Sequence, residues 1–68
     1  MDKALTVFRL ELKLEQYKIV ISTLDDVERQ LLVCQDPLRK FALQQERDYL
    51  TEKLCQLAAD IKSLAEKL

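Results

Sequence analysis

The chain of 68 residues contains no glycine and no histidine. Glycine adopts positive φ more readily than any other residue, so its absence argues against β-hairpin turns, phosphate-binding loops and nucleophile elbows. Histidine is the commonest metal ligand and the usual general base, so its absence argues against metal-dependent and acid–base chemistry. We therefore expect a protein that is not an enzyme, with no catalytic, cofactor-binding or metal-binding residues.

Long apolar runs and paired cysteines are also missing. The longest apolar run is Leu31–Cys34, whereas a membrane-spanning helix needs about 20 such residues. Cys34 and Cys55 lack the spacing of a zinc site, and in the hairpin predicted below they would lie about 25–30 Å apart, too far for a disulfide. Reduced cysteines are typical of the cytosol, so we expect a cytoplasmic protein without membrane contacts.

The chain has no excess of one charge. Its 11 Lys and Arg residues are balanced by 12 Asp and Glu residues, which leaves a net charge of −1. Binding to phosphates needs a concentrated basic surface, so this mixture argues against nucleic acid as a partner. A composition of 49% hydrophobic and 34% charged residues is typical of packed amphipathic helices. A thin pair of helices has little room for a pocket, so we expect no small-molecule substrate.

The single proline, Pro37, lies near the middle of the chain. Asp36 is a favourable N-cap, proline suits the first position of a helix, and the residue before a proline avoids the helical region. This combination predicts a helix over about residues 3–34, a turn at about 35–37 and a second helix over about 37–67. The whole chain, residues 1–68, would form one domain.

Apolar residues recur at alternating spacings of three and four in both halves, which is typical of a coiled-coil seam. Folding the chain back at Pro37 makes the seams antiparallel and places Leu14 opposite Leu57. Each seam contains one charged residue, Glu28 or Arg47, and these two could form a pair. The predicted fold is an all-α, antiparallel two-helix coiled-coil hairpin. Its predicted seams are Val7, Leu10, Leu14, Tyr17, Ile21, Leu24, Glu28 and Leu31 in the first helix, and Leu43, Arg47, Leu50, Leu54, Leu57, Ile61, Leu64 and Leu68 in the second.

Two features of the first half favour other structures. Apolar and charged residues alternate from Phe8 to Glu15, and residues 18–23 are rich in β-branched side chains, so residues 5–22 could form a strand. Ser22 and Thr23 each begin a motif that resembles a capping box, which would break the helix there. No turn residue separates these stretches, and Leu, Glu, Lys and Gln favour helix, so a continuous helix is the preferred prediction.

The chain has more apolar positions than the seam of one hairpin can bury. Val20 and Val27 widen the apolar face of the first helix, as Ala58 and Ala65 do for the second, and three apolar positions per heptad suit a bundle. A further stripe lies nearly opposite the seam of the first helix and is typical of a partner site, although isolated surface leucines are common in soluble proteins. The predicted partner interface is Leu5, Phe8, Leu12, Ile19, Val20, Val27, Ala58 and Ala65.

These features predict a scaffold-like module for protein–protein interaction or oligomerisation, which would form a four-helix bundle as a homodimer or with another helical protein. An alternative is a regulatory effector hairpin that captures a globular partner such as a small GTPase. In outline the chain is similar to the Rho-binding antiparallel hairpins, although no motif matches. A Rop-like RNA-binding bundle is a third possibility by shape, and the mixed charge argues against it.

Overall fold

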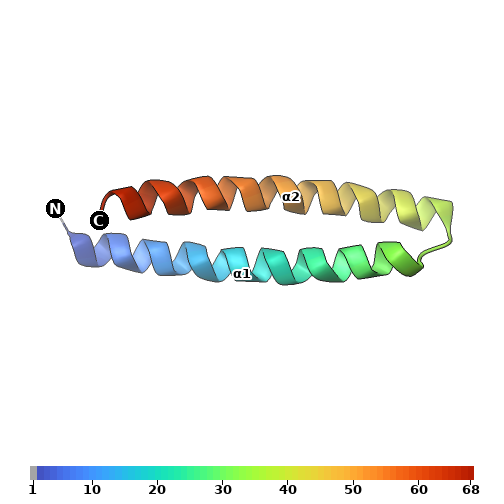
Figure 1. The fold of residues 1–68 in the computed structure, drawn as a ribbon, viewed down its shortest axis with the longest axis horizontal. Coiled ribbons are helices and arrows are strands. Elements are labelled where there is room, and N and C mark those ends of the chain that lie inside the picture. The colour runs from blue at the N-terminus through green and yellow to red at the C-terminus, as the bar shows by residue number, and fades with distance from the viewer. Residues whose placement is uncertain (1) are drawn as a thin grey trace.

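The computed structural model describes residues 2–68 as two helices. Helix α1 spans Lys3–Val33 and helix α2 spans Pro37–Glu66. The helices run antiparallel and lie side by side along their whole length (Figure 1). The all-helical prediction is therefore confirmed.

Helix α1 is continuous, so both alternatives considered for its first half are wrong. The Thr23 hydroxyl donates a hydrogen bond to the Ile19 carbonyl oxygen at 2.9 Å, within the helix, and does not cap a new helix. Val20 is buried against α2. Packing of this face against a second helix outweighs the strand preference of the β-branched residues, because that preference depends strongly on context.

Aspartate side chains cap the N-termini of both helices. The Asp2 carboxylate accepts hydrogen bonds from the backbone N–H groups of Ala4 and Leu5, at 3.1 and 3.4 Å. The Asp36 carboxylate accepts one from the Leu38 N–H at 3.1 Å, and Pro37 is the first helical residue, as the sequence predicts. Residues 34–36 make the turn, and no residue in the described range 2–68 has positive φ. The turn therefore needs no glycine.

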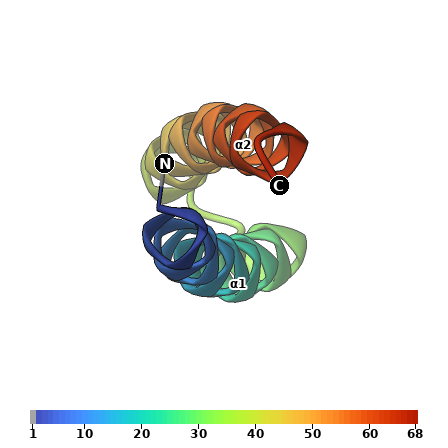
Figure 2. The ribbon, with the colours of Figure 1, turned by 90° about the vertical axis from the view of Figure 1, so that its left-hand side faces the viewer.

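The hairpin is a thin rod. Its extents are 53 × 14 × 11 Å and its radius of gyration is 15.7 Å, whereas a compact domain of this length has a radius of gyration of about 11 Å. Seen from the end that carries both termini, the helices wind about each other with a left-handed twist, as a heptad pattern requires (Figure 2). A rod two helices wide can bury only one line of side chains.

That line is the seam between the helices. On α2 it follows the predicted residues from Leu43 to Leu64, with Leu43, Leu50 and Leu57 buried, whereas the predicted Leu68 lies beyond the helix and is 51% exposed. On α1 the buried residues are Val20 and Val27. The residues that pack against this core while remaining half-buried include Tyr17, Leu24, Leu31, Cys34 and Leu54.

The predicted seam of α1 consists of two rows of residues, each with a spacing of seven, and the prediction is wrong for the row that contains Leu14. Val7, Leu14 and Ile21 are 40%, 40% and 44% exposed, so Leu14 is not buried in a layer with Leu57 as predicted. Glu28 belongs to the same row, seven residues after Ile21, and it is exposed as well. Turning α1 so that Val27 faces α2 keeps the Glu28 carboxylate in water, which avoids the cost of burying its charge.

Candidate interaction surfaces

The seam has two sides, and each side has a hollow. On one side a shallow groove of about 420 Å³ lies near the open end of the hairpin, and on the other a hollow of about 300 Å³ lies nearer the turn. On a coiled-coil helix, residues seven apart lie in one row along the helix, which we call a stripe. The residues that line each hollow therefore show which stripes lie next to the seam on that side. The groove is lined by Arg9, Leu12, Lys13, Gln16, Asp60, Ser63 and Leu64, and the hollow by Glu28, Leu31, Leu32 and Arg47.

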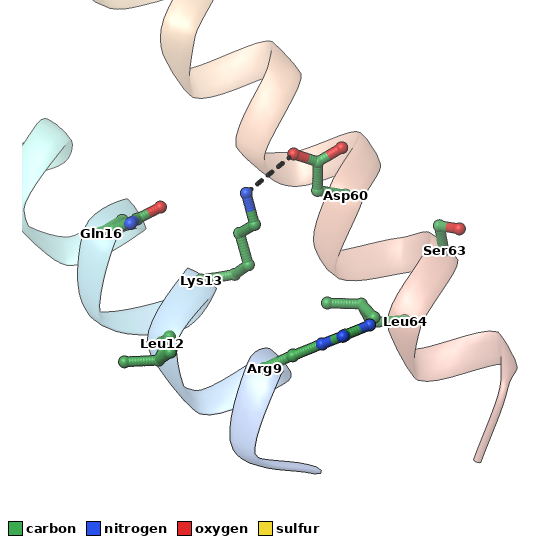
Figure 3. Close-up of a pocket in the computed structure, with 7 residues that line it drawn as sticks. All are labelled: Arg9, Leu12, Lys13, Gln16, Asp60, Ser63 and Leu64. Atoms are coloured by element: carbon green, nitrogen blue, oxygen red, sulfur yellow. Dashed lines mark hydrogen bonds and ion pairs between the residues drawn. The ribbon is translucent and has the colours of Figure 1, made fainter. Parts of the chain in front are cut away.

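An ion pair bridges the groove. The Lys13 ammonium lies 3.3 Å from the Asp60 carboxylate, with the two side chains 37% and 35% exposed. Figure 3 shows Lys13 reaching across to α2 while Leu12 points away from it. The second oxygen of Asp60 accepts a hydrogen bond from the Gln56 amide at 3.5 Å. Two of the three charged residues that line the groove, Lys13 and Asp60, are thus paired with each other, and the pair links the two helices.

The opposite side of the seam carries apolar residues from both helices toward the open end of the hairpin. On α1, the stripe of Glu28 continues toward the open end as Ile21, Leu14 and Val7. On α2, the stripe of Arg47 continues toward the same end as Leu54 and Ile61. The next stripe outward on α2 contains Ala58 and Ala65, which are exposed. We define the Leu14 face as Val7, Leu14, Ile21, Leu54, Ala58, Ile61 and Ala65.

A second apolar group lies on the outside of α1. We define the Phe8 stripe as Leu5, Phe8, Leu12 and Ile19, whose side chains are between 46% and 63% exposed. These residues lie on the far side of α1 from the stripe of Val7 and Leu14, with Arg9 and Gln16 between them and the seam. The Phe8 stripe and the Leu14 face are therefore separate surfaces.

The predicted partner interface is thus divided among three places. Leu5, Phe8, Leu12 and Ile19 are exposed together on α1, as predicted. Val20 and Val27 are only 9% and 3% exposed and lie in the core between the helices. Ala58 and Ala65 lie across the seam from Val7, Leu14 and Ile21, and not beside the Phe8 stripe.

The sequence interpretation missed Val7, Leu14 and Ile21 as surface residues because it assigned them to the seam. The sequence does not separate the two stripes, because each contains one charged residue: Glu28 in the stripe of Val7, Leu14 and Ile21, and Lys13 in the stripe of Val20, Val27 and Cys34.

The hairpin exposes more surface than its mass predicts. Its accessible surface is 5479 Å², whereas a folded monomer of 8.0 kDa exposes about 4,450 Å² by the usual scaling. The difference is about 1,000 Å². Part of this excess surrounds the turn, where Leu32, Val33, Leu38 and Phe41 are exposed. The remaining exposed apolar residues of α1 belong mainly to the Leu14 face and the Phe8 stripe.

Neither α1 nor α2 is long and apolar enough to cross a membrane. Within residues 2–68, no three His, Cys, Asp or Glu side chains come together as a metal site would require. The chain matches no protein-family model, and comparison with curated proteins and with solved structures gives no significant match. Function is therefore inferred from the surfaces described above.

Proposed function

We propose that this protein is a non-enzymatic interaction module, which associates through an apolar helical face with a second copy or with another helical protein. The observation that carries the proposal is the exposed apolar surface of a hairpin too thin to bury it. Monomeric proteins rarely expose continuous apolar patches larger than a few hundred Å². The product of such an association is a four-helix bundle, in which three apolar positions per heptad become buried.

The size of the excess surface supports the proposal. A stable protein–protein interface buries about 800 Å² on each partner, which is close to the excess of about 1,000 Å² calculated above. Apart from Leu32 and Val33 beside the turn, the exposed large apolar side chains of α1 lie between Leu5 and Ile21. Both helices contribute to the Leu14 face, and a flat surface made by two helices is the kind that another pair of helices covers.

Sedimentation velocity at several chain concentrations tests the proposal, with helix content followed by circular dichroism in the same samples. We expect a mass of at least two chains, and a helix content that falls on dilution as the assembly dissociates. A fully helical monomer at every soluble concentration would contradict the proposal, because the apolar faces would then be stable in water without a partner.

A second candidate function is the capture of a globular partner such as a small GTPase, and the position of the Phe8 stripe favours it. That stripe lies outside the Leu14 face, so a bundle built on the Leu14 face would leave it uncovered. Replacing Leu5 and Phe8 by glutamate separates the two functions. Loss of binding to nucleotide-loaded GTPases, with the mass of the assembly unchanged, would support this candidate. Absence of binding by the unmodified protein would rule it out.

A further inference from the structure

We infer that the Leu14 face binds the Leu14 face of a second copy, with the turns of both hairpins at the same end of the bundle. This inference rests on the proposed function and adds to it the face, the partner and the orientation. In this arrangement a two-fold axis runs along the rod. Each α1 then lies over the α2 of the other copy, so all neighbouring helices are antiparallel.

Contacts within one hairpin show which residues of α1 and α2 lie at the same position along the rod, and we call this position the level of a residue. Near the open end, Lys13 pairs with Asp60, and Arg9 lines the groove together with Leu64. Nearer the turn, Glu28 and Arg47 line one hollow. A two-fold axis along the rod keeps every residue at its own level, so the same levels apply between the two copies.

Side-chain sizes on the Leu14 face are complementary at these levels. The outer stripe of α1 carries the large residues Val7 and Leu14, and the outer stripe of α2 carries the small residues Ala65 and Ala58. With the turns together, Val7 lies level with Ala65 of the second copy and Leu14 with Ala58 of the second copy. Large side chains that meet small ones can interdigitate at the close helix spacing of a bundle.

Charge also favours the same-end arrangement. Among residues 2–68, no ion pair joins Glu28 to Arg47, and the Arg47 guanidinium lies 3.9 Å from the exposed Asp48 carboxylate of its own helix. With the turns together, Glu28 of each copy lies level with Arg47 of the other, and opposite charges meet twice. With the turns at opposite ends, the apolar open end of one copy would cover Glu28 and Arg47 of the other. That arrangement buries charge against apolar side chains, which is costly.

Distances between spin labels test the orientation. The labelled protein carries Gln35→Cys at the turn, with Cys34→Ser and Cys55→Ser so that only one site reacts. Serine can still donate the hydrogen bond that the Cys34 thiol makes to the Asp36 carbonyl oxygen. We expect a distance between copies below about 30 Å, because neighbouring helices lie about 8–10 Å apart. A distance close to the 53 Å length of the rod would overturn the inference.

Two matched pairs of substitutions test the face. The variant with Leu14→Glu and Ile21→Glu alters the Leu14 face, and the variant with Leu12→Glu and Ile19→Glu alters the Phe8 stripe. Each variant replaces one exposed leucine and one exposed isoleucine seven residues apart on α1. We expect the first variant to weaken dimerisation at least about a hundredfold, because it would bury unpaired charges. We expect the second to leave the dimer intact.

The outcomes separate this inference from the proposed function. If the Leu12 and Ile19 variant dissociates while the Leu14 and Ile21 variant remains dimeric, the face is wrong and the interaction module stands. A long distance between the turn labels would likewise contradict this inference, in its orientation, and leave the interaction module standing. A monomeric, fully helical wild-type protein contradicts both. Circular dichroism of each variant at high concentration serves as the folding control, since all four substituted side chains are exposed in the single hairpin.

Discussion

Truncation of Val27 tests the seam that the structure assigns to α1. Val27 is 3% exposed and lies in the core, whereas Val33 at the end of the same helix is 78% exposed. The substitutions Val27→Ala and Val33→Ala therefore make the same chemical change in two environments. Under the seam predicted from sequence alone, Val27 would only flank the interface and Ile21 would be buried. Strong destabilisation by Val27→Ala thus supports the orientation of α1 in the structure.

The expected loss of stability at Val27 is about 1 kcal/mol. Removing two buried methyl carbons costs about 1.6 kcal/mol at about 0.8 kcal/mol each, and the higher helix propensity of alanine returns about 0.6 kcal/mol. The total free energy of unfolding expected for a chain of this length is only about 3–10 kcal/mol. A loss of about 1 kcal/mol lowers the melting temperature by about 4–8 °C. Val33→Ala should change stability by less than about 0.5 kcal/mol.

Thermal and urea unfolding followed by far-ultraviolet circular dichroism measure this difference. All variants must be compared at one chain concentration, because the proposed association would make the apparent stability depend on concentration. A Val27→Ala variant as stable as wild type would refute the seam. Equal losses from Val27→Ala and Val33→Ala would refute it too, because the two environments would then be equivalent.

Three further predictions concern the cap, the ion pair and the thiols. Asp36→Ala should lower the free energy of unfolding by about 1 kcal/mol while Asp36→Asn retains most of it, and an alanine variant as stable as wild type would exclude a stabilising cap. A double-mutant cycle of Lys13→Ala with Asp60→Ala should give a coupling below about 1 kcal/mol that shrinks as salt is added, whereas a coupling insensitive to salt would contradict the half-exposed geometry. Cys55 is exposed and Cys34 half-buried, so Cys55 should react faster with a thiol reagent, and equal rates would contradict these positions. An intrachain disulfide in the folded protein would contradict the hairpin itself.

Which apolar residues of α1 are exposed depends on which of its stripes face α2. Three neighbouring heptad stripes of α1 are rich in apolar residues, and a two-helix seam can bury only two of them. The stripe left outside, Val7, Leu14 and Ile21, becomes the part of the Leu14 face that α1 contributes. The extra apolar stripe that makes the orientation of α1 hard to predict from sequence is thus also the one that supplies the proposed interaction surface.

The amino-acid sequence by itself determined the two helices, the turn at Asp36–Pro37 and the seam of α2. Caps and helix breakers act within a few residues, and α2 has only two large apolar stripes, so its buried face has one solution. The rotation of α1 was decided by the tertiary structure. Periodicity cannot choose among three adjacent apolar stripes, because the middle stripe of Leu10, Tyr17, Leu24 and Leu31 gives the same alternating spacing of three and four with either of its neighbours. Docking against α2 makes the choice, since it buries Val27, leaves the Glu28 carboxylate in water and lets Lys13 reach Asp60.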